Sequence, residues 1–177
     1  MPKPLVFDAT PLIYLTKASL TTLLEILPEE KFTTSAVFNE AVQEGKKRQA
    51  PEAMLLQNLF RCQAIKVQDP SNKEYLEYVK EIAAGNEMQP LHEAEAEVLS
   101  LAKELKGVAV ADDQIARLVA RLLGIELHGT AYILGKIYLT GKVEMETLIE
   151  KIKQMRESGW YLSAEDYLRI VEYLKSI

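Results

Sequence analysis

The chain has 177 residues, of which 48% are hydrophobic and 27% are charged; these values are ordinary for one soluble domain with a sizeable core. Its formal net charge of −5 argues against a broad surface that grips phosphates nonspecifically, although bound divalent cations would reverse the local field. The single cysteine excludes an internal disulfide and a thiolate zinc cluster. Without a membrane-length apolar run or a signal-peptide pattern, we expect a cytoplasmic protein with no membrane contact.

Short apolar segments alternate with helical patterns along the chain. The strand candidates are residues 5–7, 32–34, 64–67, 108–111 and 125–127. Helical spacing predicts a first helix over about 10–27, with a break near 18–19. The further predicted helices cover 35–44, a segment from 51 onward, 71–84, 92–106, the segment from the fourth strand to 123, 131–139, 144–157 and 163–174. Residues 85–90 are predicted to form a loop. Strands that alternate with helices indicate an α/β fold with a parallel sheet covered on both faces.

Two aspartates follow apolar strands directly. Asp8 follows residues 5–7, and Asp112 follows residues 108–111. If these strands are neighbours, both carboxylates face the crevice at the carboxyl edge of the sheet, where open α/β folds bind ligands. Alternatively, each aspartate only caps the next helix. Two such strand ends favour a ligand-binding site over two separate helix caps. If Asp112 belongs to this site, Asp112→Asn should keep or raise the melting temperature of the metal-free protein, because it removes repulsion between carboxylates.

Helix 92–106 contains three closely spaced glutamates. At about 100° per residue, Glu95 falls inside the apolar arc of this helix, whereas Glu93 and Glu97 fall outside it. A carboxylate on a buried face is unfavourable unless it is paired or bound to metal. Glu95 is therefore the functional candidate, and we expect Glu93 and Glu97 to be solvated surface charges.

The remaining acidic candidates leave alternatives open. Asp112 lies on the apolar side of its helix, whereas Asp113 precedes Arg117 by four residues, the spacing of a surface ion pair. Arg117 could instead contact a phosphate. Glu40 and Glu44 share one edge of their helix, and periodicity does not choose between them. Because all these candidates are oxygen ligands, they favour Mg²⁺ or Mn²⁺ over zinc.

Several motifs together resemble the PIN-domain family, the fold of VapC-type toxin ribonucleases, and more closely a prokaryotic branch of stand-alone PIN-like proteins. The matching segments are 6–13, 37–40, 91–102, 111–117, 123–125, 129–134 and 159–163. Ala94 stands where this branch usually has a glycine. The resemblance implies a single three-layer α/β domain over 1–177, with a central parallel sheet of four to five strands, helices on both faces and extra C-terminal helices at about 144–177.

The resemblance also implies a Mg²⁺- or Mn²⁺-dependent endoribonuclease that hydrolyses phosphodiester bonds of an RNA substrate. Matched position by position, its catalytic residues are Asp8, Glu40, Glu95 and Asp112. Its metal ligands are Asp8, Glu95, Asp112 and Asp113, and Thr10 matches a hydroxyl residue beside the first aspartate that would contact the substrate. Apart from the resemblance, we also expect Arg117 to contact the substrate through a phosphate.

Other functions and partners stay open. A catalytically weak PIN-like binding module would act as a toxin-like partner or as an RNA-associated scaffold. The sequence leaves open whether an antitoxin protein is a partner. A phosphatase of the haloacid dehalogenase type is disfavoured because Thr10 stands where that class has a second aspartate. From Gly141 onward, apolar and aromatic residues lie on more than one helix side, which predicts a homodimer; alternatively, these helices pack only within one chain.

Overall fold

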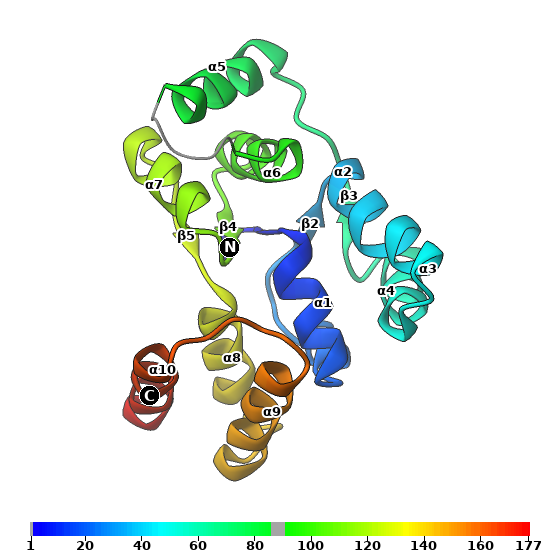
Figure 1. Cartoon of the computed structure of the whole chain (residues 1–177), viewed down its shortest axis with the longest axis vertical. Helices are drawn as coiled ribbons and strands as arrows, with labels where there is room; N and C mark the ends of the chain where they lie inside the picture. The colour runs from blue at the N-terminus through cyan, green and yellow to red at the C-terminus, as the bar shows by residue number, and fades with distance from the viewer. Residues whose placement is uncertain (1, 86–90) are drawn as a thin grey trace.

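The computed structural model describes residues 2–85 and 91–177, so most of the predicted loop at 85–90 lies outside the described residues. Within the described part, a five-stranded parallel sheet has the order β3-β2-β1-β4-β5 (Figure 1). The strands are β1 (Leu5–Phe7), β2 (Lys31–Thr33), β3 (Lys66–Val67), β4 (Val108–Val110) and β5 (Leu127–His128). This confirms the expected α/β class with a parallel sheet of four to five strands.

Strands β1 and β4 form the centre of the sheet. All their residues are buried, as expected for strands covered on both faces, whose sequences are continuously apolar. The two strands pair in parallel, with Phe7 opposite Val110. The backbone N–H of Asp8 donates to the carbonyl of Val110 at 2.9 Å. Pairing therefore places the residues after both strands at one edge of the sheet.

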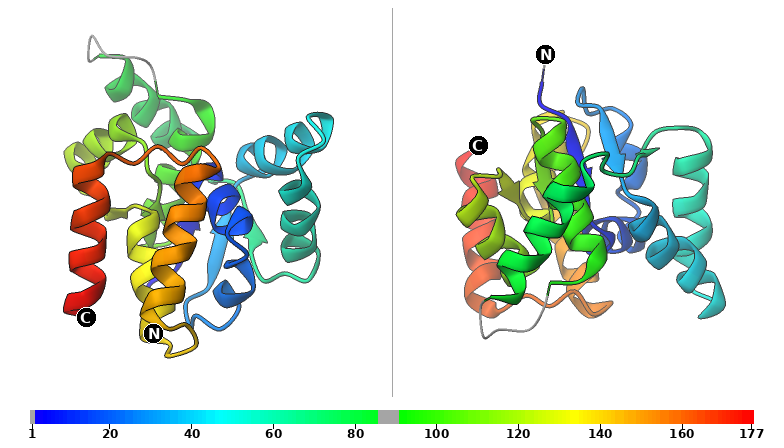
Figure 2. Two further views of the ribbon diagram at one scale, coloured as in Figure 1. Left: turned by 60° about the horizontal axis from the view of Figure 1, so that its bottom comes forward. Right: turned by 90° about the horizontal axis from the view of Figure 1, so that it is seen from above.

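Helices cover both faces of the sheet. Helices α5, α6 and α7 gather on one side, and α1, α8, α9 and α10 lie on the other (Figures 1 and 2). The helices are α1 (Ala9–Lys17), η1 (Thr21–Leu24), α2 (Ser35–Phe38), the π-helical η2 (Asn39–Glu44), α3 (Gly45–Lys47), α4 (Pro51–Arg61), α5 (Lys73–Ala84), α6 (Glu93–Glu104), α7 (Gln114–Leu123), α8 (Thr130–Leu139), α9 (Met145–Glu157) and α10 (Ala164–Ser176).

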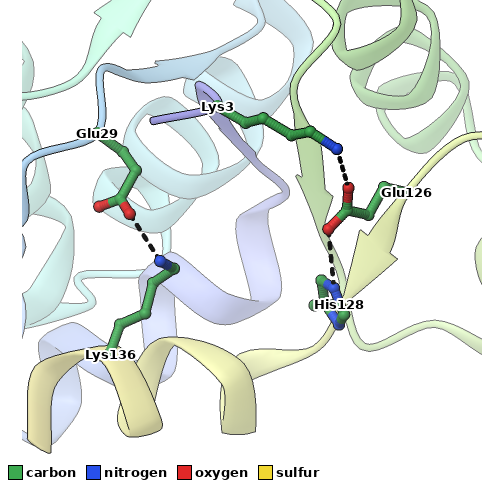
Figure 3. Close-up of polar contacts among 5 residues, drawn as sticks. All are labelled: Lys3, Glu29, Glu126, His128 and Lys136. Carbon is green, nitrogen blue, oxygen red and sulfur yellow. Dashed lines mark hydrogen bonds and ion pairs between the residues drawn. The ribbon is translucent and has the colours of Figure 1, made fainter. Parts of the chain in front are cut away.

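Ion pairs attach β5 and α8 to distant segments (Figure 3). Lys136 of α8 contacts the buried Glu29, which precedes β2, with 2.6 Å between Nζ and Oε1. Glu126 contacts Lys3 at 2.6 Å and His128 at 3.2 Å. Because breaking a buried pair leaves an uncompensated charge, the Lys136–Glu29 pair fixes the position of α8 relative to the sheet.

The C-terminal helices pack on their own domain. Leu148, Ile152 and Met155 of α9 are buried, as are Ile170 and Leu174 of α10. Leu168, in contrast, is 59% exposed. No helix in the described part of the chain is both long and apolar enough to cross a membrane.

Candidate active site

A cavity of about 720 Å³ opens at the sheet edge where β1 and β4 end. Its lining contains no lysine or arginine among the described residues. Thr10, Tyr14, His92 and the segment from Gly159 to Tyr161 also contribute to its walls. The acidic residues around it, from four separate segments, are Asp8, Glu40, Glu93, Glu95, Asp112 and Asp113. The structure thus brings together every predicted site residue except Arg117, and we call this space the acidic cavity.

Asp8 is the most enclosed of these carboxylates, with 5% of the residue exposed. Burial raises its pKa to about 7, partly offset by the backbone N–H of Ala9, and the carboxylates of Glu95, Glu40 and Asp112 raise it further. Asp8 occupies the N-cap position of α1 but makes no capping hydrogen bond through its side chain. The structural alternative for Asp8, a simple helix cap, therefore receives no support.

Asp112 has a different environment from Asp8. Its Oδ1 accepts from the backbone N–H of Thr130 at 2.7 Å, and its Oδ2 accepts from the Thr130 hydroxyl at 2.6 Å. Oδ2 also accepts from the indole Nε1 of Trp160 at 3.0 Å. Asp112 therefore holds the start of α8 and the connection between α9 and α10, in addition to lining the cavity.

Asp113 is the residue that caps the following helix. Its Oδ1 accepts from the backbone N–H of Ala116 at 2.8 Å. The predicted ion pair with Arg117 is absent from the described contacts, and that prediction is wrong. The reason is that Asp113 has extended backbone angles and lies before the helix, where the spacing rule for helical pairs does not apply. Arg117 instead lines a neighbouring cleft.

Glu95 comes from the first turn of α6. Its Oε2 accepts from the backbone N–H of His92 at 2.9 Å, which also helps to start the helix. Burial raises the pKa of Glu95 to about 7, this hydrogen bond partly offsets the effect, and Asp113 and Glu40 raise the pKa further. Glu95 therefore combines a cap-like contact with a place in the acidic cavity.

The two neighbouring glutamates of α6 differ from each other. Glu93 is exposed and lies 3.4 Å from Lys80, as expected for a solvated surface charge. The same prediction is wrong for Glu97, which is half-buried and whose Oε2 has no hydrogen-bond partner in the described structure. Both α5 and α7 contact α6, so more of α6 is covered than the single arc read from the sequence.

Of the two glutamates that periodicity could not separate, Glu40 lies at the acidic cavity and Glu44 does not. Glu40 lines the acidic cavity, whereas Glu44 is exposed and pairs with Lys47 at 2.6 Å. Both residues belong to a π-helical segment, Asn39–Glu44, in which the residue spacing departs from 3.6 per turn. Such segments occur frequently at functional sites, and their spacing explains why α-helical periodicity could not separate the two glutamates.

Thr10 and the 159–161 segment complete the walls. Thr10 lies in the first turn of α1, which begins at Ala9, so it lies beside Asp8 in the cavity. Sequence reasoning missed Trp160, which is the only tryptophan of the chain and is 6% exposed. It also missed Tyr161, which is 90% exposed. A lone tryptophan next to a glycine, within a segment that matched the family, was the available signal.

The donor chemistry of this cavity fits a hard divalent cation. Carboxylate oxygens are the ligands that Mg²⁺ and Mn²⁺ prefer. The raised pKa values of Asp8 and Glu95 reflect burial first and neighbouring carboxylates second. Within the described residues, no three Asp, Glu, His or Cys side chains are grouped closely enough to form a ready-made metal site. The site therefore offers suitable ligands that are not already gathered around one point.

Comparisons with known proteins agree with this fold. A family model described as a PIN domain matches residues 4–176. Endoribonuclease Nob1 from Pyrococcus abyssi is 39% identical over 100 residues, 56% of this chain and 58% of that protein, so the match spans little more than half of Nob1. The crystal structure of PAE2754 from Pyrobaculum aerophilum has a TM-score of 0.54 at 17% identity, covering 78% of this chain and 99% of that one. Because the family model spans nearly the whole chain, this protein belongs to the PIN-domain family.

Proposed function

We propose that this chain is a divalent-metal-dependent endoribonuclease that hydrolyses RNA phosphodiester bonds in the acidic cavity. The observation that carries the proposal is the convergence of carboxylates from four segments on one cavity, at the sheet edge where α/β folds bind ligands. Membership of the PIN-domain family and the likeness to a protein named as an endoribonuclease support it.

Asp8, Glu95 and Asp112, with Asp113 beside them, are the residues that would hold Mg²⁺ or Mn²⁺. Such a cation, when bound, polarises the scissile phosphate and lowers the pKa of an attacking water. Asp112 would enter this role already oriented, because Thr130 and Trp160 hold its carboxylate. Residues fixed in this way keep their geometry as charge develops in the transition state.

The other polar groups would act on the substrate. Glu40 is exposed at the cavity and has no hydrogen-bond partner among the described residues, so it can position a proton near the leaving oxygen through water. The Thr10 hydroxyl can donate to a phosphate oxygen. The guanidinium of Arg117, beyond the wall formed by Asp112, can neutralise phosphate charge. No covalent nucleophile is required.

The rival function is a PIN-like binding module without turnover. The pKa of Asp8, raised by burial and by neighbouring carboxylates, disfavours this alternative, because a buried acidic cluster without a cation only destabilises the fold. In the binding module, Mn²⁺ would leave the melting temperature unchanged. In the nuclease, Mn²⁺ would raise the melting temperature, and Asp8→Asn would abolish that shift.

Cleavage of an end-labelled single-stranded RNA tests the proposal directly. We expect cleavage with Mg²⁺ or Mn²⁺, none with EDTA, and a large loss in Asp8→Asn. Glu93→Gln is the matched control, because Glu93 is an acidic residue at the cavity whose side chain is exposed and paired with Lys80. If wild-type protein gives neither cleavage nor a metal-dependent melting shift, the binding module is the better description.

We also propose a cytoplasmic homodimer, and an antitoxin partner if the chain functions as a VapC-like toxin. The exposed side chains of Leu139 (64%) and Leu168 (59%) provide apolar area on α8 and α10 for a second copy. Sedimentation equilibrium tests for the dimer by measuring the mass in solution. A species near the 20.0 kDa chain mass at micromolar concentration would contradict the dimer. A partner that copurifies and inhibits cleavage would support the toxin assignment.

A further inference from the structure

A second cleft, of about 630 Å³, adjoins the acidic cavity. Both spaces are lined by Asp112, Trp160 and Tyr161, which form the wall between them. The second cleft lies among α7, the end of β5, α8 and α10, and we call it the α10 cleft. Besides Trp160, its basic and aromatic lining residues are Arg117, His128, Tyr132, Tyr161, Arg169 and Tyr173.

The α10 cleft differs from the acidic cavity in charge. It contains two arginines, Arg117 and Arg169, whereas the acidic cavity has no lysine or arginine in its described lining. The carboxylates of the α10 cleft, Asp112 and Asp166, both accept hydrogen bonds from protein groups. Among the described residues, Arg169 forms an ion pair with the exposed Glu165 one turn away and with no other carboxylate, and such surface pairs are weak. The α10 cleft is therefore the side on which a phosphodiester chain can lie beside the acidic residues.

Aromatic groups in the α10 cleft are arranged for contact with flat ligands. Tyr161 is 90% exposed at the wall shared with the acidic cavity, so its ring contributes little to the core. His128 stacks on Tyr132, with 4.3 Å between ring centroids and 16° between planes. Glu126 holds the imidazole of His128 in place (Figure 3). Exposed aromatic rings bind single-stranded nucleic acids because every base has a face on which they can stack.

We propose that the α10 cleft binds the single-stranded RNA next to the scissile phosphate. A base stacks on Tyr161, and a neighbouring phosphate contacts Arg169. This assignment rests on the proposed ribonuclease function and adds to it the surface on which the substrate strand lies beside the acidic cavity. A base must be unpaired to lie there, since a base within a duplex cannot offer its face to Tyr161. The assignment also gives the C-terminal helices a role, because residues 159–177 supply both groups.

Trp160 provides a direct measurement of occupancy. It is the only tryptophan, it lines both spaces, and its indole N–H donates to Asp112. Ligands in either space should therefore change its fluorescence. The probe is an eight-nucleotide oligoadenylate RNA, titrated into the full chain in EDTA so that cleavage does not interfere. Anisotropy of a labelled copy of the same RNA gives an independent affinity.

We expect Tyr161→Ala to weaken binding about tenfold and Tyr161→Phe to bind like the wild type, since the ring is retained. Arg169→Ala should weaken binding and reduce the slope of log affinity against log salt by about 0.7. Tyr78→Ala on α5 and Arg61→Ala on α4 are matched controls, because both residues are exposed and lie outside the two spaces. An abasic oligomer should bind weakly and be insensitive to Tyr161→Ala.

Wild-type affinity in both Tyr161→Ala and Arg169→Ala would overturn the proposal, even if the protein cleaves RNA. Loss of binding in these variants, with no cleavage under any metal, would support the α10 cleft and overturn the nuclease function instead. If Tyr161→Ala changes the sedimentation mass but not RNA affinity, the cleft belongs to an interface with a second copy, and the proposal fails. Circular dichroism of each variant controls for folding.

Discussion

The ends of β1 and β4 carry aspartates in equivalent positions, and their surroundings differ. Asp8 is 5% exposed, makes no side-chain capping bond, and has a pKa raised to about 7 by burial. Asp112 is half-buried, and its two oxygens accept three hydrogen bonds from Thr130 and Trp160. One strand end therefore carries a buried carboxyl group that protein donors compensate only in part, and the other carries a carboxylate held by three hydrogen bonds.

This difference suggests a division of roles between the two aspartates. Without a cation, the charge of Asp8 costs stability, because the backbone N–H of Ala9 compensates only partly for lost hydration. Asp112 costs less, because its donors replace water. Asp8 is therefore the residue whose behaviour should depend most on metal, whereas Asp112 should affect both stability and activity.

The strongest test of this comparison is Asp8→Asn. We expect cleavage to fall at least about a hundredfold, in the range of other losses of charge-stabilising groups at active sites. The metal-free melting temperature should rise, because a buried charge is removed. Initial rates and thermal melts in EDTA measure the two effects. A lower melting temperature combined with normal cleavage would make Asp8 a structural residue.

Glu95 extends the comparison to a carboxylate on a helix. We expect Glu95→Gln to reduce cleavage about ten- to hundredfold, the range seen when metal-site residues are altered. Glu93→Gln, two residues away and exposed, should change the rate less than twofold, on the scale of ordinary surface substitutions. Steady-state rates with Mn²⁺ provide the measurement. Equal losses in the two variants would show that the acidic cavity does not distinguish them.

The pH dependence of stability sharpens the contrast. The pKa of Asp8 is about 7 in the folded protein and about 4 when unfolded, so the folded state holds more protons between these values. The stability of the metal-free protein should therefore be highest at the acidic end and fall as pH rises from about 4 to about 7. Melting temperatures in EDTA should drop by several degrees across this range. Asp8→Asn should reduce this slope but not remove it, because the pKa of Glu95 is also raised to about 7. An unchanged curve would contradict the raised pKa of Asp8.

The smallest expected effect concerns Asp112. From the sequence we expected Asp112→Asn to keep or raise the metal-free melting temperature, but its contacts reverse that expectation. An amide cannot accept at both positions, so we expect a loss of about 1–3 kcal/mol of unfolding free energy. Asp113→Asn is the control, because asparagine also caps helices well. Urea denaturation in EDTA measures both variants, and a more stable Asp112→Asn would mean that repulsion outweighs the hydrogen bonds.

Local sequence determined the strand ends and the candidate acids. Strands β1 and β4 were recognisable because strands buried on both faces are continuously apolar, and the charged residue after each run marks the sheet edge. Glu95 was recognisable because a carboxylate inside an apolar arc contradicts its surroundings. These signals depend on a few consecutive residues, and the fold preserves them.

Tertiary structure alone decided how each acid is held. The partners of Asp112 lie 18 and 48 residues away along the chain, and no local pattern reports such distances. Glu40 lines the acidic cavity and Glu44 does not, within a π-helical segment whose residue spacing differs from that of an α-helix. Glu97 is covered because α5 and α7 both contact α6. The sequence by itself indicated that Asp8, Glu95 and Asp112 meet at the sheet edge. Only packing between distant segments determined which of them is compensated by hydrogen bonds and which remains available to a cation.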